Sequence, residues 1–556
     1  MRLVRTARGF AVLIGLPFAL WGDDFMRRFT GAAVLVWIRG WVRGAGCGVL
    51  APPEPRAQAC QSRGAGVYRV AHMRRAASIL AVIIVLLSLS GAKLRAGESV
   101  PALSPGIQSL WEQEYATGDW GGLRPQLAAR GVIFNFTYAA DPIGVVSGGI
   151  KRGVFYNGFL DLGTDIDLEK LVGWKGGHFH VNGFHPHGEN GSANYAGDIG
   201  TCSNIEAYDT YRLYELWVEQ NFFEDRFSLR AGQITFDSEF AVLDAYGGLF
   251  VQSGFAVPEA LSANLPMPIF PNATPGLRVR IAPVKGFAIQ AAVFDGNSAP
   301  ALTPDRSPNA AVSTDFNRHG THWALRPDEG ALVAGEISYR VNPVPEEEAS
   351  ATHTTADARP LGTPAAPTVP QRGLAGSYEV GFLYHTDSFA DIYDVTLAGL
   401  GSSLAPATAR NRGADYAIYV NIEQELWREP RSEDQGLGAF AHAVWMPPDR
   451  NFIEFSVEGG LDYHGAIPGR DHDALGLGVA FLKISDQVAS AVRAANRHDH
   501  TSLSVPNFEA TIELVYRYQV APWLSIQPHA QYVIQPGGTK DHDNALILGV
   551  RTNFAF

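Results

Sequence analysis

The chain has 556 residues, of which 46% are hydrophobic and 18% are charged, and its formal net charge is −12. An acidic chain of this kind lacks the broad basic surface that binds nucleic acids. Its three cysteines, Cys47, Cys60 and Cys202, are too few for a fold held together by disulfides.

The N-terminal region contains the pattern of an export signal. Met73 is followed by two arginines, an apolar run at residues 76–89 and small residues around Ala92. We therefore expect residues 73–96 to be a signal peptide and residues 1–72 to be an upstream extension, with translation starting at Met73. The alternative is that residues 1–72 form a membrane-anchored segment. Removal of the signal leaves Cys202 alone, which excludes an intrachain disulfide.

Residues 97–130 are predicted to form a periplasmic segment that precedes the main domain. Pro125 is typical of a helix start, and Gly131 is typical of the position just after a helix end. The segment is therefore expected to contain one or two helical turns.

The last fifty residues alternate between apolar and polar side chains. In residues 508–520, for example, Ile512 and Leu514 alternate with Glu509 and Glu513. Successive side chains of a strand point to opposite faces. The runs are long enough for strands that cross a bilayer, which need roughly 9 to 11 residues. The alternative is a large soluble barrel or sandwich.

The same pattern recurs along residues 131–556 and predicts an all-β fold, a transmembrane antiparallel β-barrel of 16 strands with a short N-terminal periplasmic helix. The predicted strands are 132–140, 156–168, 177–185, 210–222, 226–234, 276–283, 286–295, 330–341, 376–386, 414–426, 437–446, 452–464, 472–482, 507–520, 523–535 and 544–556. Long connections fall at one end of this barrel and short turns at the other, except for a Pro/Ala/Thr-rich insertion at 342–375.

Several motifs along residues 110–556 occur together and in a fixed order. They include GDWGGLRP at residues 118–125, SLRAGQ at 228–233, PDRN at 448–451 and QYVIQPGG at 531–538. In this combination the chain resembles the carbohydrate-selective porin family, the glucose porins of Gram-negative outer membranes. The resemblance implies a multi-pass outer-membrane channel for facilitated diffusion of carbohydrates, monosaccharides such as glucose among them, into the periplasm. It implies no enzymatic activity and no cofactor.

Strand parity assigns side chains to the lumen of the predicted barrel, because charges on the lipid face are costly. Sugar hydroxyls both donate and accept hydrogen bonds, so arginines, carboxylates, amides and an aromatic ring are the expected contacts. The candidate pore-lining residues for substrate binding are Arg230, Glu215, Trp217, Glu219, Asn182, Arg278, Glu454 and Glu458. Loops 186–209 and 235–275 are expected to fold inward and narrow the channel.

Other interpretations remain at this point. His178, His180, His185 and His187 have the spacing of a possible metal site, but a solvated rim is the favoured interpretation and no metal is expected.

The function has two alternatives: an outer-membrane barrel enzyme, or a barrel that mainly binds a partner. The expected partners are a small carbohydrate and outer-membrane lipid, and the sequence leaves open whether the barrel is a monomer or a homotrimer.

Overall fold

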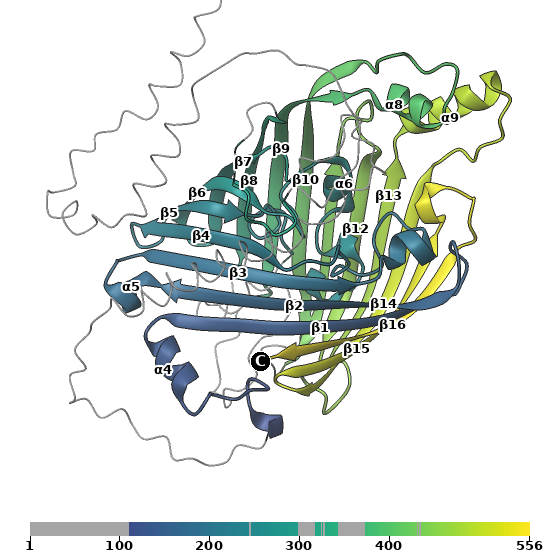
Figure 1. Ribbon diagram of the computed structural model, residues 1–556. Helices are drawn as coiled ribbons and strands as arrows, with labels where there is room; N and C mark the ends of the chain where they lie inside the picture. The colour runs from purple at the N-terminus through teal and green to yellow at the C-terminus, as the bar shows by residue number, and fades with distance from the viewer. Residues whose placement is uncertain are drawn as a thin grey trace, which may run out of the picture. The chain divides into compact units, whose positions relative to one another are not determined.

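The computed structural model describes residues 110–556, except for 244–245, 299–316, 324, 326–328, 343–372, 431 and 433–434. The sheet is a closed antiparallel barrel in which every strand pairs with its neighbours in the chain and β1 pairs with β16 (Figure 1). The strands are β1 (Val132–Ser147), β2 (Gly153–Asp167), β3 (Gly177–Gly188), β4 (Arg212–Phe222), β5 (Phe227–Ile234), β6 (Thr274–Val284), β7 (Phe287–Asp295), β8 (Ala331–Val341), β9 (Gly376–Ala390), β10 (Asn411–Arg428), β11 (Gly436–Trp445), β12 (Ile453–His464), β13 (Ala474–Ile484), β14 (Phe508–Ala521), β15 (Leu524–Ile534) and β16 (Ala545–Ala555).

The sixteen predicted strands are thus confirmed, although several of their bounds differ from the predicted ones. The first strand was predicted to end at residue 140 but continues to Ser147. By strand alternation Ile453 shares the lipid-facing parity of Phe455 and Val457, but it is fully buried, because the pairing of β12 with β13 shifts register between Ile453 and Phe455. The expected segments 1–72 and 73–96 and most of the insertion at 342–375 lie outside the described residues.

Short helices lie between the strands and before the first one. The helix predicted near Pro125 is α4 (Leu123–Ala129). The others are α5 (Leu168–Val172), α6 (Glu259–Asn264), α8 (Ile392–Gly399) and α9 (Asp486–His498), with helical turns η2 (Leu110–Glu112), η3 (Ser192–Ala196), η4 (Gly247–Leu249), η5 (Ser253–Phe255) and η7 (Pro536–Gly538). In the part of the chain that the structure describes, no helix combines the length and apolar character needed to cross a membrane.

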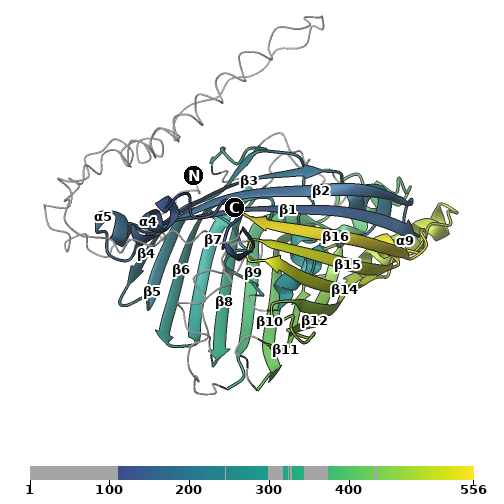
Figure 2. The same cartoon turned by 90° about the horizontal axis from the view of Figure 1, so that it is seen from below.

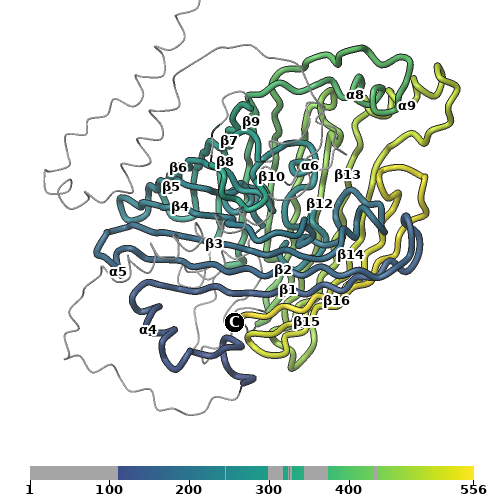
Figure 3. Tube along the Cα trace, in the orientation of Figure 1, coloured from purple at the N-terminus to yellow at the C-terminus, as the bar shows by residue number. Residues whose placement is uncertain are grey.

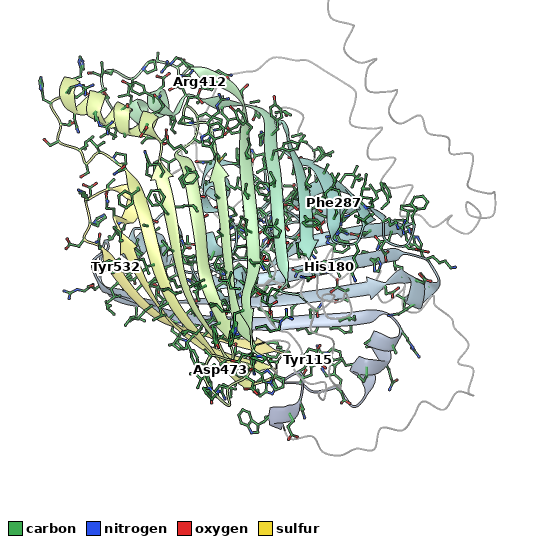
Figure 4. The ribbon with its side chains drawn as sticks, turned by 180° about the vertical axis from the view of Figure 1, so that it is seen from behind. Tyr115, His180, Phe287, Arg412, Asp473 and Tyr532 are labelled. Atoms are coloured by element: carbon green, nitrogen blue, oxygen red, sulfur yellow. The ribbon has the colours of Figure 1, made fainter. Side chains whose placement is uncertain are left out.

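The two ends of the barrel differ in their connections. Helices α8 and α9 pack on each other at the end that carries the long loops, near the labelled Arg412 (Figure 4). The labelled Asp473 and Tyr115 lie at the opposite end, where the turn between β14 and β15 is only two residues long. We call these the long-loop end and the short-turn end.

The exterior of the barrel is apolar, as the alternation predicts, and the inner face carries polar side chains together with apolar ones, such as Leu332 and Leu383, that pack against residues 235–273. On β14, Leu514 is 51% exposed, whereas Glu513 is fully buried. The outward-facing side chains of the other strands follow the same pattern, with exposed Leu277, Ile337, Val380, Ile418 and Leu548. The inner face therefore holds the groups that can contact a solute.

The loop between β5 and β6, residues 235–273, folds into the barrel (Figure 3). Its helix α6 packs on β11 and β12. Carboxylates on four strands accept hydrogen bonds from its backbone N–H groups: Glu336 from Ala241 (3.0 Å), Glu423 from Tyr246 (2.8 Å), Glu513 from Val251 and Gln252 (2.8 and 2.9 Å), and Glu458 from Glu259 (3.3 Å). Buried backbone donors need such partners, so these carboxylates fix the path of the loop.

The loop between β3 and β4, residues 189–211, is also attached to the inner wall. Glu509 on β14 accepts hydrogen bonds from Ile199 and Gly200 N–H at 2.9 Å. Arg551 on β16 donates to the Asn204 side chain at 2.7 Å. Both loops that were expected to fold inward therefore do so, and many inward carboxylates hold loops rather than line an open channel.

The two ends of the described chain meet at the closure of the barrel. Ala116 N–H donates to Ala555 C=O, and Phe556 N–H donates to Phe136 C=O, both at 2.9 Å. Trp111 stacks on Trp523 next to this closure, with ring centroids 6.0 Å apart. Figure 2 shows β16 beside β1, with the C-terminus near α4.

Candidate functional site

The candidate site lies on the inner face of strands β4, β5 and β6. Glu219 is directly opposite Arg230, and Arg230 is directly opposite Arg278 in the pairing of these strands. Directly opposite residues on one face of a sheet have Cβ atoms roughly 5 Å apart. The alternation of each strand therefore brings three charged side chains into one row.

A fourth charge comes from the inward loop and completes what we call the Arg–Glu square: Arg230, Arg278, Glu219 and Glu239. Arg230 Nε lies 2.7 Å from Glu219, and the same guanidinium pairs with Glu239. Arg278 Nη2 lies 2.7 Å from Glu219, and its Nε lies 2.6 Å from Glu239. Each arginine thus binds both carboxylates, and the four charges sum to zero.

Trp217 and His180 support the square from the long-loop side. The guanidinium carbon of Arg230 lies 3.6 Å from the centre of a Trp217 ring, a cation–π contact. The His180 ring stacks on the Trp217 ring with centroids 5.0 Å apart, and His180 Nδ1 forms a hydrogen bond with Asp165 Oδ1 at 2.6 Å. Gly232 lies opposite Trp217, where a Cβ would come within 2.6 Å of the Trp217 Cα, so the backbone approach requires glycine.

The four side chains of the square differ in exposure. The side chains of Arg230 and Glu219 are 14% and 12% exposed, whereas those of Arg278 and Glu239 are 3% and 9% exposed. All four side chains are thus largely buried, with Arg230 the most exposed and Arg278 the least exposed.

Two further predicted residues lie next to this group. Glu215 is buried on β4 and accepts a hydrogen bond from the Ser238 hydroxyl of the inward loop at 3.1 Å. Asn182 is buried on β3 and donates to Asp161 at 2.7 Å. Both are thus part of the wall around the square.

The remaining two predicted residues lie elsewhere. Glu458 points inward as its parity predicts, but it is fully buried beneath the loop and lies 3.3 Å from His442. The prediction that Glu458 lines the pore is therefore wrong, because the loop covers it. Glu454 lies at the long-loop end, where it accepts a hydrogen bond from Asp486 N–H at the start of α9 at 3.0 Å.

The solvated rim that the sequence favoured is wrong for His180 alone, because His178, His185 and His187 are partly exposed. His180 is buried inside the barrel, whereas His185 lies on the outer face and stacks on Tyr211, with centroids 3.9 Å apart. Within the described residues, no three His, Cys, Asp or Glu side chains are grouped so that they could hold a metal ion.

Sequence reasoning did not identify Glu239 as a partner of the arginines. Parity assigns faces only to residues in strands, and Glu239 lies in a helical turn of the inward loop. The sequence gives one indication of this role: Glu239 follows the end of β5 by five residues, so it lies near Arg230 once the loop turns inward.

The comparisons with known proteins agree with this architecture. A family model described as carbohydrate-selective porin, OprB family, matches residues 151–556. The chain belongs to the OprB family of carbohydrate-selective porins. Porin B of Pseudomonas aeruginosa is 25% identical to it over 83% of this chain and 94% of the relative, and a putative porin QuiX of Acinetobacter baylyi is 23% identical over 80% and 94%.

A solved structure shows the same fold. The high-pH structure of OprB from Pseudomonas putida has a TM-score of 0.67, with 22% identity over 81% of this chain and all of the other. The protein is therefore a multi-pass β-barrel porin of the Gram-negative outer membrane that lets carbohydrates diffuse across it. Because short turns face the periplasm in such barrels, the short-turn end is the periplasmic end.

Proposed function

We propose that the solutes of this porin are monosaccharides such as glucose, and that they contact Arg230 and Glu219 as they pass. The observation that carries the proposal is the Arg230–Glu219 pair of the Arg–Glu square, where one partly accessible donor and one partly accessible acceptor lie side by side on the inner wall. Two loops occupy part of the interior, which favours small solutes.

The chemistry of the square suits a sugar hydroxyl. Arg230 is a pure donor, and a carboxylate such as Glu219 is an acceptor, so adjacent hydroxyls of one sugar can bond to both. Two such hydrogen bonds hold a sugar only weakly overall, so it leaves easily, as conduction requires. Trp217 acts through Arg230 in this proposal, because the guanidinium covers its ring.

We also propose that the barrel does no chemistry on its solute. In support, Glu219 and Glu239, the two carboxylates of the Arg–Glu square, are both bound by the same two arginines and serve to attach the loop.

A single chain closes its own barrel. We therefore propose that one chain is a complete channel within outer-membrane lipid, whether alone or in a homotrimer.

Liposome swelling with the purified protein tests this function. We expect glucose to enter faster than a disaccharide or a trisaccharide, and to be recovered unchanged. Glucose entry no faster than into empty liposomes would overturn the proposal in favour of a partner-binding barrel. Release of a modified sugar would instead identify an enzyme.

A further inference from the structure

Arg280 is an inward-facing cation that lies just below the Arg–Glu square. It follows Arg278 by two residues on β6 and so points to the same face of the sheet. It lies on the periplasmic side of Arg278, because β6 runs toward the short turn at residues 285–286. Ser228 on β5 and Gln290 on β7 are its direct neighbours in the sheet.

The charge of Arg280 has no partner of its own. Within the described residues, its half-buried side chain forms neither a hydrogen bond nor an ion pair. Glu219 and Glu239 are within electrostatic reach, but each already binds two guanidinium groups. The charges of the square cancel, and Arg280 remains in excess.

The surroundings of Arg280 increase this positive potential. Arg278 and Arg340 are both close enough to repel it. The next carboxylate along the row is Glu336 on β8, beyond Gln290. Glu336 accepts hydrogen bonds from Ala241 N–H, the Tyr419 hydroxyl and the Gln290 amide, at 2.7 to 3.0 Å. Its oxygens are therefore occupied by the loop and the wall.

We propose that Arg280 is an anion-binding position of the channel, which takes sugars that carry a carboxylate or a phosphate. A guanidinium binds either group through two parallel hydrogen bonds, and it does so best where no protein carboxylate competes. The step from Arg278 to Arg280 is roughly 7 Å, so the hydroxyls of one sugar can contact Arg230 and Glu219 while its anionic group lies at Arg280. The inference rests on the proposed sugar pathway past the square and extends it to charged solutes.

The test compares three variants of the full-length protein in planar bilayers and in liposomes. Arg280→Gln removes the charge, and Arg280→Lys keeps the charge but not the planar fork. Lys285→Gln is the matched control, because it removes one positive charge from the exposed turn that follows β6. Gluconate and glucose 6-phosphate permeation, each measured relative to glucose, are the readouts, and the cold-to-heated shift on a denaturing gel checks folding.

We expect Arg280→Gln to lower the permeation of at least one of the two anionic sugars, relative to glucose, by about tenfold. The sugar that responds identifies the group that is recognised. Arg280→Lys should retain part of the preference, and Lys285→Gln should match the wild type. Unchanged relative permeation of both anions in folded Arg280→Gln would overturn the inference, as would an equal loss in Lys285→Gln. Absence of glucose flux in the wild type would instead refute the proposed function.

Discussion

Replacement of Arg230 by alanine separates the sugar-binding role of the Arg–Glu square from its structural role. In the variant, Glu219 and Glu239 both keep an ion pair with Arg278, at 2.7 and 2.6 Å. No carboxylate is left unpaired, so we expect the free energy of unfolding to fall by only about 1–2 kcal/mol, mainly from the lost contact with Trp217.

The effect on sugar binding should be larger. A hydrogen bond to a charged donor contributes about 1.5–3 kcal/mol, which corresponds to a factor of roughly 10 to 150 in binding. We therefore expect the glucose concentration that halves the ion current to rise by at least about tenfold in Arg230→Ala.

The measurement is current block in planar bilayers, with the melting temperature recorded for the same samples. Arg278→Ala is the matched control, because its side chain is only 3% exposed and binds the same two carboxylates. In this control both carboxylates keep their ion pairs with Arg230, and the hydrogen bond from Arg278 to Ser228 is lost, so stability should fall by a similar amount, about 1–3 kcal/mol. An unchanged half-blocking concentration in Arg230→Ala, together with a lowered melting temperature, would show that Arg230 is purely structural.

Three further predictions concern the inward loops. Glu239→Gln should release the loop from both arginines and give a larger, noisier single-channel current; a current identical to that of the wild type would contradict the role of Glu239 as an anchor. Burial raises the pKa of Glu259 in α6 from 4.5 to about 7. The charged form is therefore penalised in the folded state, and stability should fall by on the order of 3 kcal/mol as the pH rises from about 4.5 to above 7. Melting temperatures at pH 5 and pH 8 should show a smaller decrease in Glu259→Gln than in the wild type, and equal decreases would exclude Glu259 as the cause. Cys202 is fully buried in the other loop, so a maleimide should label it only after denaturation; labelling of the native protein would show that this loop opens.

Strand alternation predicted the barrel because each strand faces lipid on one side and the barrel interior on the other. The alternation gave the wrong end for β1 and the wrong face for Ile453. The first strand was predicted to end at residue 140, but Pro142 is exposed on the outer face and does not end it, and β1 continues in register with β2 through Gly144 and Val145. Ile453 lies beyond a register shift, which turns its side chain inward.

The candidate site was predicted only in part, because parity gives the face of a residue but not what covers that face. Arg230, Glu219 and Arg278 share one row, and their proximity follows from strand pairing. Glu458 also faces inward, but the loop lies over it, and no local pattern predicts where a loop of 39 residues between Ile234 and Thr274 will pack. Glu239 belongs to the same loop and was missed for the same reason.

The anchors of the inward loops restrict the order in which the barrel can assemble. Ile199 is held by Glu509, 310 residues later in the chain, and Val251 is held by Glu513, 262 residues later. Contacts of such large separation form late, because the intervening chain must be ordered first. Both anchors lie on β14, so the two loops can dock fully only after β14 has joined the barrel. The interior of the barrel is therefore wider before this step than after it.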